Sequence, residues 1–222
     1  METLHTFLDL MGDLINGVLR LNPEVFQAAL DSSITGIFSL IILFLAGVSD
    51  TIGHSVVFFA NRVPRGRFLF AILVEALVFV IGVFFWAGSI WIMASFVFNA
   101  HQGYGYVVRT VALGYVPLLF GFLILLPYLG NIIFVTLRIW VLLAVLVGVS
   151  VAYDFGFWPA LICSVLGWVF LTFLARLPFL RVDLVDNLLW RLSTGVDKEL
   201  DTQEAVDEYM RKTRTRRSRR GR

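Results

Sequence analysis

Four ionisable residues lie within long apolar stretches of this 222-residue chain: Asp50, His54, Glu75 and Arg138. A charged side chain inside a membrane helix costs ~2.5–3.5 kcal/mol on insertion scales, so such side chains are expected to find partners. His54 lies ten residues before Pro64, and Glu75 lies eleven residues after it. Two antiparallel helices that turn at Pro64 would therefore hold His54 and Glu75 at nearly the same depth.

Arg138 is expected at a similar depth, because it lies seven residues into an apolar run that enters from the same face. At ~1.5 Å per residue, all three would lie roughly 10–17 Å below the ends of their helices. We predict a buried polar cluster of His54, Glu75 and Arg138, with Asp50 one turn from His54. The favoured interpretation is a charge-compensated contact that fixes helix order. A proton relay or a polar substrate site is the alternative.

A second pair of charges is predicted at the opposite face of the membrane. Arg109 begins one apolar run, and Asp154 lies in the turn that follows another. The two side chains could form a salt bridge, or each could extend independently to the aqueous interface.

Motifs of known enzyme classes are absent from the sequence. It contains no His-Glu-x-x-His, no Gly-x-Ser-x-Gly and no phosphate-binding glycine loop. Cys163 is the only cysteine, which excludes an intrachain disulfide and a cysteine-based metal site. We therefore predict no catalytic residues, no metal and no cofactor, and we expect that the chain is not an enzyme.

The elements that must position these residues are predicted from composition and hydropathy. Hydrophobic residues make up 59% of the chain and charged residues 15%, against ~25% charged residues in soluble domains. A membrane-spanning helix needs ~20 apolar residues. Five runs meet this requirement and predict an all-α bundle of transmembrane helices, over residues 34–61, 68–98, 107–126, 131–152 and 157–174. Pro117 predicts a kink in the third span.

Four regions are expected along the chain. Residues 1–32 form an amphipathic N-terminal segment, with a helix over 4–21 and a second start at Asn22 as cap and Pro23 as first helical residue. Residues 33–177 form the transmembrane domain, in which the short connections at 127–130 and 153–156 require antiparallel neighbours. Residues 178–209 are amphipathic and then acidic. Residues 210–222 form a polybasic tail.

The tail predicts contact with anionic lipids. Its last twelve residues hold eight of the 18 basic residues of the chain and no acidic residue, namely Arg211, Lys212, Arg214, Arg216, Arg217, Arg219, Arg220 and Arg222. Each can contribute about 1 kcal/mol near an anionic surface. A solvated topology signal is the second interpretation, and nucleic-acid binding is the least favoured. The basic loops and the tail share one side in a five-span arrangement, which predicts a cytoplasmic C-terminus and an external N-terminus.

The stretch from Gly103 to Leu174 resembles the Yip (Ypt-interacting protein) family of small membrane proteins. The features that carry the resemblance are Gly114, Tyr115 and Pro117 of a Gly-Tyr-Val-Pro motif, Pro127 at the end of that helix, Trp140, and an Asp-x-Gly turn at Asp154. The stretch from Leu45 to Trp91 is similar to bacterial, notably cyanobacterial, members. The resemblance implies a five-helix domain of no known catalytic activity, in a bacterial cytoplasmic or thylakoid membrane.

Eukaryotic relatives are linked to Rab-type GTPases, but this chain lacks an Asp-Leu-Tyr-Gly-Pro type of motif and has a basic tail. That partnership is therefore not carried over. We expect a scaffold, assembly or membrane-organising and trafficking factor with a protein partner of unknown identity. A small transporter, or transporter subunit, that uses the polar cluster is the alternative, and an intramembrane enzyme of unrecognised type is a weaker one.

Overall fold

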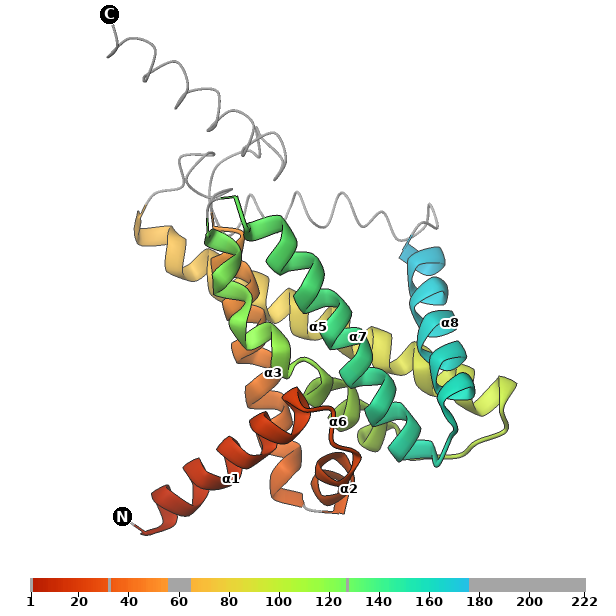
Figure 1. Ribbon diagram of the computed structural model, residues 1–222. Coiled ribbons are helices and arrows are strands. Elements are labelled where there is room, and N and C mark those ends of the chain that lie inside the picture. Colours follow the sequence, from red (N-terminus) through yellow and green to blue (C-terminus); the bar gives the residue numbers. More distant parts are fainter. Residues whose placement is uncertain (1, 32, 56–64, 127, 176–222) are drawn as a thin grey trace, which may run out of the picture.

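The computed structural model describes residues 2–31, 33–55, 65–126 and 128–175. All the secondary structure of these residues is helical, as the sequence predicts. In chain order the elements are α1 (Glu2–Leu19), α2 (Pro23–Asp31), α3 (Ser33–Gly53), α5 (Arg65–Val97), α6 (Tyr104–Gly114), the 3₁₀ helix η1 (Val116–Leu125), α7 (Gly130–Tyr153) and α8 (Phe157–Ala175) (Figure 1). The predictions for Pro127, for the acidic segment 178–209 and for the basic tail lie outside the described residues.

Four helical stretches of the described residues are long and apolar enough to cross a membrane: Thr35–Gly53, Arg67–Val97, Tyr104–Leu125 and Gly130–Tyr153. The third of these combines α6 and η1. A shorter apolar helical stretch follows at Phe157–Phe170. Together they support a multispanning membrane protein.

The surface of α5 explains why lipid must be the solvent. Large apolar side chains recur at every fourth position along one face of this helix and are exposed, at Leu69, Leu73, Leu77, Ile81 and Phe85. Phe96 near its end is 83% exposed. In water such a continuous apolar face would be a site of aggregation, whereas in a bilayer it contacts acyl chains. At 33 residues, α5 is about 50 Å long, so it must tilt or project beyond a ~30 Å hydrocarbon layer.

The N-terminal segment folds as predicted, into two helices joined by a tight turn. Asn22 accepts the backbone N–H of Glu24 on its side-chain oxygen at 3.0 Å, and Pro23 is the first residue of α2. Asn22 thus satisfies a free N–H group at the start of the helix, where Pro23 needs none. Leu21 has a positive φ of 56° at the turn.

The hairpin formed by α1 and α2 packs against the helical bundle. Leu14 and Val18 of α1 and Phe26 of α2 are buried in a core with Phe38 and Ile42 of α3. The indole N–H of Trp140 on α7 donates to the Leu19 carbonyl at 3.2 Å. The hairpin is therefore attached to the bundle through its apolar face.

The first predicted span ends earlier than expected, so the prediction of one helix over 34–61 is wrong at its C-terminal end. α3 ends at Gly53, and a turn follows in which the N–H of Ser55 bonds to the Ile52 carbonyl at 3.0 Å. The hydroxyl of Thr51 and the imidazole of His54 bond to carbonyls of the last helical turns. Such local side-chain bonds compete with helix continuation. Residues 56–61 lie outside the described residues.

The third predicted span is broken rather than kinked. α6 ends at Gly114, Tyr115 has φ −85° and ψ 1°, and the chain continues as η1. Pro117 causes the break: its ring clashes with the carbonyl four residues earlier, and it disfavours α-helical dihedrals at the residue before it. The prediction of a distortion at Pro117 is confirmed, although the change of helix type was not foreseen.

The remaining predicted helices match the prediction within a few residues and form an antiparallel series. Gly114 of α6 lies against Val145 of α7, and Thr110 of α6 lies against Gly148 of α7. A turn with Asp154 at φ 53° then reverses the chain into α8, where Cys163 and Gly167 pack against Ile90 of α5. The main core lies between α5, α6, α7 and α8.

Candidate functional site

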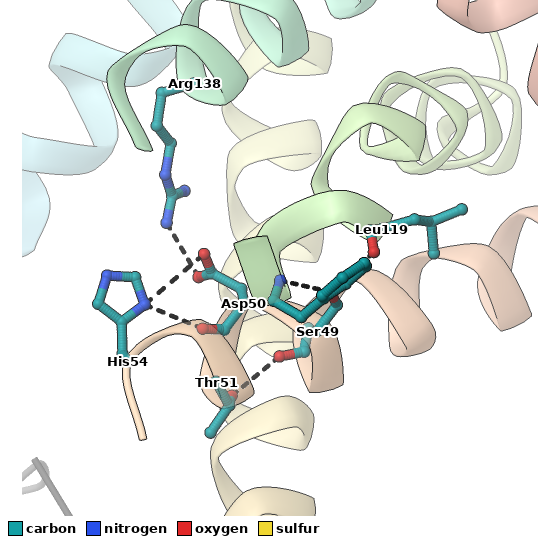
Figure 2. Close-up of polar contacts among 8 residues, drawn as sticks. Ser49, Asp50, Thr51, His54, Leu119 and Arg138 are labelled. Atoms are coloured by element: carbon teal, nitrogen blue, oxygen red, sulfur yellow. Dashed lines mark hydrogen bonds and ion pairs between the residues drawn. The ribbon is translucent and has the colours of Figure 1, made fainter. Parts of the chain in front are cut away.

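Three polar side chains meet near the C-terminal end of α3, Asp50 and His54 from the α3 end and Arg138 from α7, and Ser49 lies next to Asp50 in the chain (Figure 2). We refer to these four residues as the Asp50 node. The bundle brings them together because α3, η1 and the first turns of α7 lie side by side at one end (Figure 1).

Asp50 and Arg138 form an ion pair. A terminal guanidinium nitrogen (Nη2) of Arg138 donates to Oδ2 of Asp50 at 3.0 Å, the length of a charge-assisted hydrogen bond. The side chain of Asp50 is 13% exposed and that of Arg138 is 40% exposed. The carboxylate is thus largely shielded, while the guanidinium reaches the bundle surface.

The other carboxylate oxygen of Asp50 is less well satisfied. Oδ1 is buried and, among the described residues, has no hydrogen-bond partner, as is also true of Nε of Arg138. His54 places Nδ1 3.8 Å from Oδ1 and 2.9 Å from the backbone carbonyl oxygen of Asp50. Because a carbonyl only accepts, Nδ1 of His54 carries the proton. A protonated His54 would add a second positive charge beside Asp50.

Phe134 contacts both basic side chains of the node. The His54 ring meets the Phe134 ring edge-on at 5.5 Å between centroids, and the guanidinium carbon of Arg138 lies 5.2 Å from the same ring centroid. Cation–π attraction favours this position of Arg138. Phe134 therefore orients Arg138 toward Asp50.

Ser49 connects the node to η1. Its hydroxyl donates to the Leu119 carbonyl at 2.8 Å and accepts the N–H of Phe122 at 3.0 Å. The approach is possible because Gly121 faces α3: an added Cβ there would lie 3.0 Å from the Cα and N of Asp50. A Cβ added at Gly53 would lie even closer to the Gly121 carbonyl oxygen. The node therefore joins three elements, α3, η1 and α7.

Glu75 lies on α5 and is partly buried, where it makes at least one contact of its own. The next residue, Ala76, contacts Gly47 of α3 through its backbone, which places Glu75 at about the level of residues 47–50. Its predicted membership in the cluster stays a prediction.

The predicted depth of His54 is wrong. It assumed a helix continuing to Pro64, whereas α3 ends at Gly53. Asp50 is three residues from that end, or about 5 Å, and His54 follows it. Arg138 lies eight residues into α7, and long helical side chains point toward the helix N-terminus. The node therefore lies near the ends of its helices.

The predicted ion pair at the opposite face does not form between Arg109 and Asp154 in the described structure. The guanidinium of Arg109 lies against Gly36 of α3, with Nε 2.7 Å from where a Cβ would be. Asp154 is exposed in the left-handed turn after α7. Packing on the bare Gly36 backbone takes Arg109 toward α3 instead of the α7–α8 turn.

The residues of the Gly-Tyr-Val-Pro motif form the break in the third span. Gly114 has no room for a side chain, since a Cβ would lie 2.4 Å from a methyl group of Val145. Tyr115 is buried, and its ring meets those of Phe79 and Trp86 edge-on. Pro117 is buried as well. These residues serve packing and backbone geometry.

Sequence reasoning missed Ser49 and Phe134. The only signal for Ser49 is a hydroxyl inside an apolar run, and 70 to 73 positions separate it from its partners. Within the described residues, no three His, Cys, Asp or Glu side chains are placed to hold a metal ion. The chain matches no family model, and no curated protein and no solved structure is significantly similar to it.

Proposed function

We propose that this protein is a non-enzymatic, multispanning membrane scaffold that assembles or organises a partner protein in the bilayer. The observation that supports this most directly is that the charged side chains of the Asp50 node join one helix to another. Asp50 is largely buried and its ion pair joins α3 to α7, while its neighbour Ser49 joins α3 to η1. Charges used in this way fix the order and rotation of helices and so give the lipid-facing surface one defined shape.

In this proposal α8 is a fifth span. It has 19 residues, about 28 Å of helix, which nearly matches ~30 Å of hydrocarbon. Five crossings leave the N-terminus outside and the arginine-rich tail in the cytoplasm, where it binds anionic lipid headgroups. The host membrane is then a bacterial cytoplasmic or thylakoid membrane, and the fold is of the Yip type.

Co-purification tests the scaffold. The full chain would be isolated in a gentle detergent as wild type, as Asp50→Asn and as Asp13→Asn, the last changing an exposed acid on α1. A scaffold set by the Asp50 node retains the same partner in a fixed ratio in the wild type and Asp13→Asn, and loses part of it in folded Asp50→Asn. Recovery of a solitary protein from every preparation would count against the proposal.

A small transporter is the second candidate, because one observation favours it. The third span is discontinuous at Tyr115, and its second half, η1, lies against the ion-paired Asp50. Secondary transporters bind substrate or coupling ions at such discontinuous helices.

Reconstitution separates the two candidates. The purified chain would be placed in liposomes that contain a pH-sensitive dye, with a potassium diffusion potential to drive proton entry. A proton-coupled transporter acidifies the lumen faster than protein-free liposomes do, and Asp50→Asn abolishes the difference. The scaffold gives the protein-free rate with both wild type and variant.

A further inference from the structure

The 3₁₀ helix η1 is unusually long. It runs for ten residues, Val116–Leu125, whereas 3₁₀ segments above three or four residues are uncommon because their hydrogen bonds are poorer than those of an α-helix. Its residues after Pro117 are leucine, isoleucine, phenylalanine and one glycine, none of which blocks an α-helix in lipid. A specific contact must therefore favour the 3₁₀ register.

Ser49 provides such a contact. Its hydroxyl bonds to the Leu119 carbonyl and to the Phe122 N–H, which are the acceptor and the donor of one 3₁₀ turn. In an α-helix the Phe122 N–H would bond to Leu118 instead, and the Leu119 carbonyl would accept from Leu123. Conversion to an α-helix therefore requires that the Phe122 N–H leave the Ser49 hydroxyl, because this group has a single proton to donate.

Burial along η1 follows the same register. Leu118 and Gly121 are buried, and Ile124 lies against Gly53, which is the three-residue spacing of a 3₁₀ face. Phe122 and Leu125 are exposed. The 3.6-residue period of an α-helix would turn Phe122 toward α3 in place of Gly121 and would separate η1 from Asp50.

We propose that η1 is an element with two registers and that Ser49 latches it in the 3₁₀ form. Release of the latch converts η1 to an α-helix. Ten residues then shorten from about 20 Å to about 15 Å, which draws the end of η1 toward Tyr115. Gly121 leaves the backbone of Asp50, so the length of the third span is coupled to the Asp50 node. In lipid both registers satisfy the backbone groups internally.

A distance measurement across the third span tests this proposal. Nitroxide labels would be placed at Tyr106→Cys and Leu125→Cys, both exposed sites, in a full-length Cys163→Ser background in nanodiscs. Ser49→Ala removes the latch, and a new population with a separation shorter by about 5 Å is expected in pulsed electron resonance. Ser89→Ala is the matched control, since Ser89 is buried and, within the described part of the chain, bonds only to Phe85 of its own helix. It should keep the wild-type distance.

Pro117→Ala tests the same equilibrium from the other side, because it restores an N–H group and removes the ring clash that opposes an α-helix. It leaves Ser49 in place and keeps the test valid if Ser49→Ala does not fold. A shorter population is expected here too. Wild-type distances in every folded variant of Ser49 and Pro117 would overturn the proposal.

Discussion

The ion pair between Asp50 and Arg138 joins helices that are 88 positions apart in the chain. Its energetic value lies between two limits. An exposed pair contributes ~0–1 kcal/mol, while removal of one partner of a fully buried pair costs ~3–5 kcal/mol. Asp50 is shielded, but Arg138 is 40% exposed, so the pair is expected to fall between these limits.

Asp50→Asn, Arg138→Met and the double variant should therefore be coupled by about 1–2 kcal/mol in the free energy of unfolding. Each single change leaves one charge unpaired, whereas the double variant leaves none. Reversible denaturation in mixed micelles measures these free energies, with Asp13→Asn as an exposed control. Additive effects of the two single changes would show that the pair contributes nothing.

Gly121 and Gly82 allow a matched comparison of one added methyl group. At Gly121 it would lie 3.0 Å from the backbone of Asp50, whereas at Gly82 nothing lies within 4 Å. Gly121→Ala should lower the unfolding free energy by about 1–3 kcal/mol. Gly82→Ala should leave it unchanged or raise it by up to about 1 kcal/mol through helix propensity. Equal effects of the two substitutions on the unfolding transition would contradict the close approach of η1 to α3.

Among the elements, α2 is a short helix whose largest buried side chain is Phe26. Phe26 is fully buried and lies against Gly148 of α7, beside Thr110 of α6. A nine-residue helix is marginal by itself, so its position depends on this contact.

Phe26→Ala should therefore release α2 from the bundle, with a loss of about 3–5 kcal/mol in the free energy of unfolding. Backbone amide exchange over residues 23–31 should accelerate strongly in the variant, as measured by mass spectrometry. Gln27→Ala changes an exposed neighbour and should leave exchange as in the wild type. Unchanged protection of α2 in Phe26→Ala would mean that other contacts dock it.

For the whole molecule, the number of crossings decides which side each end occupies. Cys163 is buried and should not react with thiol reagents in the folded protein, and Cys163→Ser gives a background without cysteine. With five spans, a membrane-impermeant maleimide should label Asp13→Cys in intact cells. It should label Arg219→Cys only after permeabilisation. Labelling of both from the same side would require an even number of crossings and would remove the proposed orientation.

The sequence by itself determined that lipid surrounds the long helices, and it also determined the positions of most helices. Long apolar runs predict lipid contact because every apolar residue of a run adds surface that must be removed from water, however the helix is packed. The limits of α5, α7 and α8 agree with the prediction within a few residues. Local chemistry also determined the start of α2 at Asn22–Pro23 and the distortion at Pro117. These features depend on residues within about one helical turn of one another.

Only the tertiary structure decided which polar groups meet. Arg138 was predicted to join a cluster, but its bond to Asp50, and that of Ser49 to the backbone of η1, depend on the rotation and depth of separate helices. When a helix is apolar on all its faces, hydropathy contains no information on its rotation about its own axis. The depth of His54 differs from the prediction because α3 ends early, at Gly53. The long 3₁₀ register of η1 likewise depends on a hydroxyl group some 70 positions away in the chain.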